Sequence, residues 1–315
     1  MCCGDSILKI FPSEIKEILI RAKMDQEQLQ EIRIRVGQPL VCIYQGNEFF
    51  LYRNGTLGKE RKQGFVVSRE NLIETVSYVS HYSLYAFEEE LKQGYITLPG
   101  GHRVGIAGKI VMEEHRIRSV KYISFLNIRL SHEIRGCAKQ VFPYLIKNGA
   151  FCHTLIISPP KCGKTTMLRD IIRMVSDGNS FIVGQNVGVV DERSEIGGSY
   201  HGVPQNDLGI RTDVLDCCPK SEGMMMLIRS MSPDIIAVDE IGDYRDVEAI
   251  EAVFHCGCKL LATVHGSSME DVKRKPLLNR MVQSHSFERY VILDHEQQVG
   301  HIQNIFDERG TRLYV

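Results

Sequence analysis

Residues 153–172, HTLIISPPKCGKTTMLRDII, decide the fold of this chain. They begin with an apolar, β-branched run at 154–157 that is typical of a buried strand, and they end in a helical stretch at 167–172. The loop at 158–166 lies between the two. Strand, loop and helix in this order form a phosphate-binding unit, because the backbone N–H groups at a helix N-terminus converge on an anion. The sequence therefore predicts a phosphate site in this loop.

Three residues of the loop carry the chemistry that a triphosphate needs. Gly163 lets the chain approach the phosphates, Lys164 supplies positive charge for the β- and γ-phosphates, and Thr165 offers a hydroxyl to Mg²⁺. We therefore expect ATP and Mg²⁺ as cofactors. The predicted cofactor-binding residues are Ser158, Pro159, Pro160, Lys161, Cys162, Gly163, Lys164, Thr165 and Thr166.

The loop departs from the pattern G-x-x-x-x-G-K-[ST]. Ser158 stands in place of the first glycine, where the extended backbone expected before a proline suits serine. Lys161 stands where such loops often have glycine, and it is strained if the backbone there has a positive φ. The alternative interpretation is a Gly-Lys-Thr loop that merely begins an ordinary helix.

An apolar run at 235–238 ends in two carboxylates, Asp239 and Glu240. The run is a predicted strand of the same sheet, so its carboxyl end lies near the phosphate loop. We expect Asp239, together with Thr165, to be the metal-binding pair, and Glu240 to polarise the attacking water. The alternative is an acidic N-cap for the helix that begins near Asp246.

A predicted strand at 187–190 is followed by Asp191, Glu192 and Arg193. Their side chains should emerge at the carboxyl edge of the sheet, where open α/β folds bind their ligands. We count Asp191 and Glu192 as catalytic candidates. The alternative is a surface Asp–Arg turn.

A third strand end, after 259–264, delivers His265. A histidine here is placed to hydrogen-bond a γ-phosphate, so His265 joins Glu240 among the catalytic candidates. The alternative is a structural or helix-capping residue, but Ser267 and Ser268 already offer caps for the next helix.

The chain divides into two predicted domains within an α/β class. The first, 1–143, mixes helices, including one at 68–93, with alternating strands that begin near residue 31. The second, 144–315, begins with a helix that ends at Asn148-Gly149. Short apolar runs then alternate with helices, which is typical of a parallel sheet covered on both faces.

Composition limits the partners and the compartment. Lysine and arginine number 38 against 39 acidic residues, a net charge of -1, so nucleic acid is an unlikely partner. The 10 scattered cysteines indicate a reducing cytosol. Charges interrupt each apolar run before the roughly 18 residues that span a bilayer. We expect a cytoplasmic protein that is peripheral to the membrane through its partners.

Four elements in this order resemble the Walker A, Asp box, Walker B and His box of the secretion ATPases of type II and type IV systems and of pilus motors: Lys164-Thr165, Asp191-Glu192, 234–240 and 263–268. The phrase SPDIIAVDEIGD is especially similar. Over nearly the full length, stretches such as EIRIRVGQPL and VVDERSEIGGSYHGVPQNDLGIRTDVLD resemble a family of stage III sporulation proteins, predicted ATPases of the channel complex between mother cell and forespore.

The resemblance implies a RecA-like P-loop NTPase domain, ATP hydrolysis and a homo-oligomeric ring, expected to be a hexamer, with nucleotide between its two domains. It also implies membrane proteins of the same channel complex as partners. Arginines should reach phosphates across subunits, since a planar guanidinium binds phosphate bidentately. The candidates are Arg103, Arg129, Arg135, Arg193 and Arg211, of which Arg193 and Arg211 are also predicted catalytic residues.

Three functions stay open from the sequence. The first is a ring ATPase that couples hydrolysis to assembly of, or transport through, a sporulation membrane channel. The second is a nucleotide-gated scaffold with little turnover, an idea motivated by Ser158 and Lys161. The third is a nucleic-acid-associated P-loop ATPase, which the balanced charge disfavours.

Overall fold

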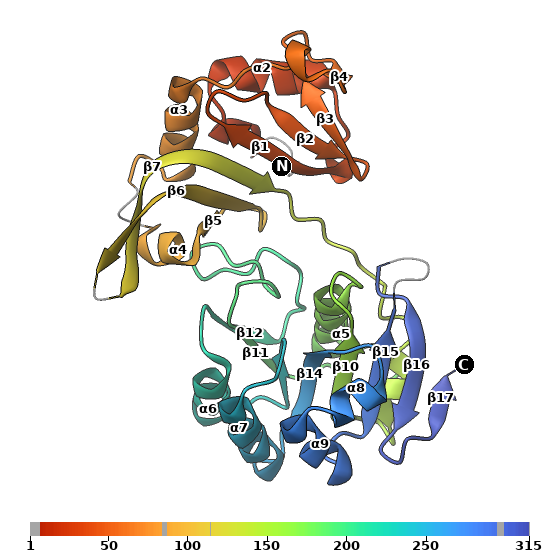
Figure 1. Ribbon diagram of the computed structural model, residues 1–315. Coiled ribbons are helices and arrows are strands. Elements are labelled where there is room, and N and C mark those ends of the chain that lie inside the picture. Colours follow the sequence, from red (N-terminus) through yellow and green to blue (C-terminus); the bar gives the residue numbers. More distant parts are fainter. Residues whose placement is uncertain (1–6, 84–86, 114, 295–298, 315) are drawn as a thin grey trace. The chain divides into compact units, whose positions relative to one another are not determined.

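Figure 1 shows the chain as a computed structural model. The structure describes residues 7–83, 87–113, 115–294 and 299–314. Within these residues, no helix combines the length and the apolar character that a membrane crossing requires.

The chain forms two compact units, Met1–His132 and Glu133–Val315, each with its own hydrophobic core. The segment 133–143, which the sequence analysis assigns to the first domain, packs its side chains in the second unit. Ala138 and Phe142 are fully buried there, against the sheet that carries the phosphate loop. The second unit therefore begins at Glu133.

The first unit is built on a seven-stranded sheet in the order β4-β3-β2-β1-β7-β6-β5, in which paired strands run antiparallel. Alternation along β1 buries Ile32 and Ile34 on the covered face. The predicted meander is confirmed in β1 to β3. The strands are β1 (Leu29–Arg35), β2 (Val41–Tyr44), β3 (Asn47–Leu51), β4 (Leu57–Gly58), β5 (Tyr95–Thr97), β6 (Arg103–Glu113) and β7 (Arg116–Arg129).

The predicted helix at 68–93 is wrong, because the structure has two helices there. Ser68 caps the first one, as the sequence indicates, in a reciprocal pair with Asn71. His81 and Tyr82 then adopt positive φ values of 47° and 63°, which a right-handed helix cannot contain. The helices of the unit are α2 (Ser13–Ala22), α3 (Arg69–Val79) and α4 (Glu88–Gln93), with short 3₁₀ turns η1 (Leu8–Ile10), η2 (Gln26–Gln28) and η3 (Arg61–Gln63).

The second unit is built on an eight-stranded sheet in the order β12-β11-β13-β14-β10-β15-β16-β17. The first six strands of this order are parallel, and β16 and β17 are antiparallel. Every residue of β10, β11, β13 and β15 is buried, as expected for strands covered on both faces. The strands are β10 (Thr154–Ser158), β11 (Val187–Asp191), β12 (Thr212–Asp216), β13 (Ile235–Val238), β14 (Lys259–His265), β15 (Arg289–Leu293), β16 (Ile302–Asp307) and β17 (Arg312–Tyr314).

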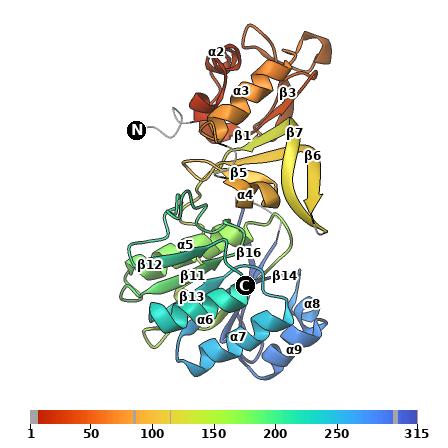
Figure 2. The same cartoon turned by 90° about the vertical axis from the view of Figure 1, so that its left-hand side faces the viewer.

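Helices cover both faces of this sheet (Figure 2). α5 (Lys164–Asp177) packs Met167, Leu168 and Ile171 into the core of one face. The other face is covered by α6 (Lys220–Ser230), α7 (Tyr244–His255), α8 (Met269–Lys273) and α9 (Pro276–Gln283). The predicted three-layer arrangement is therefore confirmed.

The predicted helix that ends at Asn148-Gly149 is wrong. Only a 3₁₀ turn, η5 (Phe142–Leu145), forms there, and a small hairpin of β8 (Ile146–Lys147) and β9 (Ala150–Phe151) follows. Asn148 and Gly149 have φ values of 54° and 76°. These values fit a two-residue hairpin turn, for which an Asn-Gly pair is the usual sequence.

Candidate functional site

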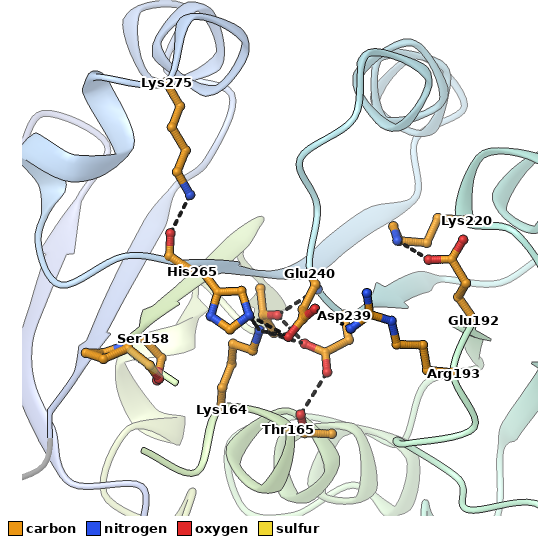
Figure 3. Close-up of polar contacts among 12 residues, drawn as sticks. Ser158, Lys164, Thr165, Glu192, Arg193, Lys220, Asp239, Glu240, His265 and Lys275 are labelled. Atoms are coloured by element: carbon orange, nitrogen blue, oxygen red, sulfur yellow. Dashed lines mark hydrogen bonds and ion pairs between the residues drawn. The ribbon is translucent and has the colours of Figure 1, made fainter. Parts of the chain in front are cut away.

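Four neighbouring parallel strands, β11, β13, β14 and β10, end at one edge of the second sheet. Because they run in the same direction, the residues that follow them gather at this edge. Figure 3 shows Lys164, Asp239, Glu240 and His265 pointing toward one another there. The structure thus brings together residues that lie up to 101 positions apart in the chain.

Lys164 lies at the centre of the cluster. Its Nζ donates a hydrogen bond of 2.7 Å to Glu240 Oε1 and lies 3.7 Å from Asp239 Oδ1 and 3.5 Å from His265 Nε2. Only 7% of the side chain is exposed, so its charge acts in a poorly hydrated environment. An ammonium group held in this way is available to a phosphate that enters the site.

Thr165 and Asp239 form a second contact of the site. The Thr165 hydroxyl donates a hydrogen bond of 2.8 Å to Asp239 Oδ2. The Thr263 hydroxyl donates to the other oxygen, Asp239 Oδ1, and accepts a bond of 2.9 Å from the Glu240 N–H. Thr263 therefore fixes both carboxylate residues, a role that the sequence analysis did not assign to it.

The phosphate loop leads into the N-terminus of α5, whose first N–H groups lack partners within the helix. Lys161 has a φ of 65° and Gly163 a φ of 87°, so the strain expected at Lys161 is present. The Gly300 N–H donates a bond of 2.8 Å to the Cys162 carbonyl and braces the loop from the β15–β16 connection. Beside the loop lies a cavity of about 490 Å³, lined by Pro159, Pro160, Lys161, Gly163, Lys164, Thr165, Thr166, Arg193, Glu195, Glu240, His265 and Val299.

Glu240 is surrounded by two cationic side chains, Lys164 and Arg193, and by the imidazole of His265. Besides Lys164, His265 Nε2 lies 2.7 Å from its Oε1, and Arg193 Nη1 donates a bond of 3.1 Å to its Oε2. Burial alone would raise the pKa of Glu240, but the Lys164 hydrogen bond and these charges hold it below its ordinary value. The backbone of Glu240 has a φ of 57°, a strained conformation that is common at functional sites.

Asp191, another predicted catalytic residue, lines a small cavity with Asp239 and Glu240, but its carboxylate binds the backbone of the loop after β11. Its carboxylate accepts three backbone hydrogen bonds, of 2.7 Å from Glu195, 2.9 Å from Ile196 and 2.8 Å from Gly197. Burial is the largest influence on this group and raises the pKa of Asp191 to about 6. Asp191 thus organises the loop that follows β11.

Glu192 and Arg211 also have partners outside the Lys164 cluster. Glu192 accepts a hydrogen bond from Lys220 Nζ. Arg211 Nη1 donates a bond of 2.9 Å to the Ser176 carbonyl, at the far end of α5 from the phosphate loop. With a rise of 1.5 Å per residue, this end lies about 16 Å from Thr165. Within its own chain, Arg211 is therefore not part of the site.

Two residues without a sequence signal bind the backbone of predicted site elements. Lys275, at the start of α9, donates a hydrogen bond to the His265 carbonyl (Figure 3). Arg169, on α5, donates to two carbonyls of the loop that follows β11. Both side chains bind carbonyl oxygens. Neither residue belongs to a sequence motif, so only the folded structure shows their roles.

The donor set fits a magnesium–triphosphate complex. No cluster of three or more histidine, cysteine or acidic residues suited to a metal occurs in the described part of the chain. Mg²⁺ does not need one, because it is often held by one or two protein oxygens, phosphates and water. Thr165 and Asp239 supply such oxygens, and Lys164 with the first turn of α5 supplies the phosphate donors.

Comparisons with known proteins find relatives that match nearly the whole chain. Residues 3–313 match the family model described as sporulation stage III, protein AA. The stage III sporulation protein AA of Bacillus subtilis (strain 168) is 39% identical over 310 residues, which cover 98% of this chain and 97% of that protein.

Solved structures share the fold. The Legionella pneumophila ATPase DotB has a TM-score of 0.58 at 15% identity, covering 94% of this chain and 82% of its own. The pilus retraction motor PilT, solved with bound ADP, has a TM-score of 0.55 at 13% identity, covering 91% and 77%. These matches confirm the predicted RecA-like P-loop fold with an additional N-terminal domain. The family model and the full-length relative show that the chain belongs to the sporulation stage III protein AA family.

Proposed function

We propose that this chain is a Mg²⁺-dependent ATPase. The observation that carries the proposal is the meeting of Lys164, Thr165, Asp239 and Glu240 at the N-terminus of α5, beside a cavity that the phosphate loop lines. The fold supports it, because DotB is described as an ATPase and PilT is solved with bound ADP.

Each side chain has a role that follows from its chemistry. Lys164 binds the β- and γ-phosphates of the substrate. Thr165 and Asp239 would hold Mg²⁺, which would neutralise negative charge on the phosphate oxygens. On binding, Lys164, His265 and Arg193 exchange the Glu240 carboxylate for phosphate oxygens. Glu240 is then free to orient water and to accept its proton.

The second part of the proposal concerns the process that ATP hydrolysis drives. We propose that the chain assembles as a homo-oligomer, expected to be a hexameric ring, and acts on membrane proteins of a sporulation channel from the cytoplasmic side. Membership in the stage III protein AA family supports the sporulation context. The shared fold with a pilus motor and with DotB supports a role as a motor.

Two substitutions and a phosphate-release assay test the ATPase. In Lys164→Ala, the loss of a charged donor should weaken ATP binding by roughly 100-fold and abolish turnover. Glu240→Gln should retain ATP affinity within about threefold while turnover falls by roughly 100-fold or more, because only the proton acceptor is lost. Lys139→Ala, at an exposed position outside the cavity, is the control. A Glu240→Gln protein that hydrolyses ATP at the wild-type rate would remove Glu240 from the mechanism.

A nucleotide-gated scaffold is the second candidate. The strained backbone at Lys161 and the ion pairs of Glu240 with Lys164 and Arg193 favour it, since both features oppose a hydrolytic geometry. In that case the wild-type chain binds ATP with Mg²⁺ but releases phosphate no faster than Glu240→Gln, even at concentrations at which it oligomerises.

A further inference from the structure

Arg169 joins the phosphate-loop helix to the loop that follows β11. It lies one turn after Thr165 on α5. Its Nε donates a hydrogen bond of 2.9 Å to the Ile196 carbonyl, and its Nη2 donates one of 2.9 Å to the Glu195 carbonyl. The planar guanidinium thus holds two successive carbonyls at once, which a lysine cannot do with the same geometry.

Asp191 holds the same short segment by its N–H groups. Its carboxylate accepts the N–H groups of Glu195, Ile196 and Gly197 at 2.7 to 2.9 Å. Two oppositely charged side chains, from α5 and from the end of β11, therefore bind the segment 195–197 through its carbonyl and its N–H groups. Hydrogen bonds to charged groups are stronger than neutral ones, so this segment is held firmly.

The segment 195–197 adjoins the residues that reach the candidate nucleotide site. Arg193 and Glu195 both line the cavity beside the phosphate loop. Arg193 is 68% exposed on its side chain, yet its Nη1 lies 3.1 Å from Glu240 Oε2. An exposed arginine has many rotamers, so its reach to Glu240 depends on where its backbone is held.

We propose that Arg169 is a positioning residue of the ATPase site: with Asp191 it ties the segment 195–197 to the phosphate-loop helix, so that Arg193 reaches Glu240 and the phosphate cavity. This inference rests on the proposed function for its effect on turnover. The tie itself is independent of nucleotide. A movement of α5 at the phosphate loop is transmitted through Arg169 to the loop that carries Arg193.

Amide hydrogen exchange measures how firmly Arg169 holds the segment 195–197, and it requires no nucleotide. In Arg169→Gln the amides of 195–197 should exchange roughly tenfold faster than in the wild type, because loss of the charged donor favours local opening. Arg173→Gln is the matched control, since Arg173 lies one turn later on α5 and pairs with Asp170 at 2.7 Å instead. Equal protection of these amides in wild type and Arg169→Gln would overturn the proposal.

Turnover tests the consequence for the site. Arg169→Gln should lower kcat roughly tenfold and leave ATP affinity within about threefold, whereas a general loss of folding would lower both. Arg169→Lys keeps the positive charge but loses the planar guanidinium that binds two carbonyls. Its kcat should therefore lie between the kcat of Arg169→Gln and that of the wild type. Because Arg169 acts through Arg193, the double variant Arg169→Gln/Arg193→Gln should be no slower than Arg193→Gln alone.

Two outcomes of the kinetic test are decisive. If the two arginine substitutions multiply in their effect on kcat, Arg169 does not act through Arg193, and the proposal is overturned. If the wild type shows no turnover at all, the ATPase proposal fails, while hydrogen exchange still decides whether Arg169 holds the loop.

Discussion

At the residue scale, Gly163 has no room for a side chain. A Cβ on this residue would lie 2.5 Å from Val299 Cγ1 and 2.6 Å from the Gly300 nitrogen, and its φ of 87° is itself unfavourable for other residues. We expect Gly163→Ala to cost about 1 kcal/mol for the backbone conformation and about 1–3 kcal/mol more for overpacking. Urea unfolding measures the loss of stability, and calorimetry should show weakened ATP binding.

Gly257→Ala is the control for that prediction. Gly257 has a similar φ of 79°, but an added Cβ would meet nothing within 4 Å. Gly257→Ala should therefore lower the free energy of unfolding by only about 1 kcal/mol, the cost of the backbone conformation. Its affinity for ATP should be unchanged. Equal destabilisation by the two alanines would show that the contact with the β15–β16 connection does not constrain the phosphate loop.

Individual site residues were predictable from the sequence where they belong to a sequence motif. Lys164 contacts Glu240 and Thr165 contacts Asp239, as their positions after predicted strands indicated. Arg169 was not predictable, because a helical arginine one turn after a phosphate loop has the same pattern as a solvent-exposed one. Its hydrogen-bond partners are backbone carbonyls of the loop that follows β11. Every residue type has a backbone carbonyl, so the sequence does not indicate which residues Arg169 binds.

At the scale of elements, the loop after β11 depends on a buried carboxylate, which gives it a pH dependence. Burial raises the pKa of Asp191 to about 6 from its ordinary value of 3.8, so the folded state binds this proton more tightly than the unfolded state. The contribution to stability is therefore fully present below the unfolded pKa and is lost as pH rises toward about 6. A shift of about two pKa units corresponds to about 3 kcal/mol.

Comparison with Asp191→Asn separates the contribution of Asp191 to the pH dependence of stability from the contributions of the other carboxylates. The free energy of unfolding of the wild type minus that of Asp191→Asn should fall by up to about 3 kcal/mol between pH 4 and pH 7, because asparagine does not titrate. Urea titrations at several pH values measure this difference. A difference that stays constant over this range would contradict the assignment.

Strands were more predictable than the helices near them. The β-branched runs that became β10, β11, β13 and β14 are buried on both faces, and this environment leaves a clear apolar signal. The helix expected before Asn148 did not form, because the Asn-Gly turn favours a hairpin and its local geometry outweighed a weak apolar period. The Asn148-Gly149 pair is therefore the local signal in the sequence that indicates the hairpin.

At the scale of the whole molecule, the five arginine candidates separate into two groups. In the second unit, Arg135 pairs with Glu133 and Asp207, Arg193 binds Glu240, and Arg211 binds the Ser176 carbonyl. In the first unit, Arg103 and Arg129 lie directly opposite each other on β6 and β7. On its other side Arg129 lies opposite Glu31 of β1, and the Arg103 guanidinium lies 4.6 Å from the centroid of the Tyr95 ring. Arg129 is exposed, and the resemblance to ring ATPases implies arginines that reach across subunits, so we expect Arg129 to act on a phosphate of a neighbouring subunit.

Mixed assemblies test this expectation. Arg129→Ala should bind ATP as the wild type does and turn over slowly, and Lys164→Ala should not turn over. In a head-to-tail ring mixed at equal amounts, about one quarter of the sites would pair an intact Lys164 with an intact Arg129 from the neighbour. The mixture should therefore hydrolyse ATP faster than the average of the two variants measured alone. A rate equal to that average would mean that Arg129 acts within its own chain or not at all.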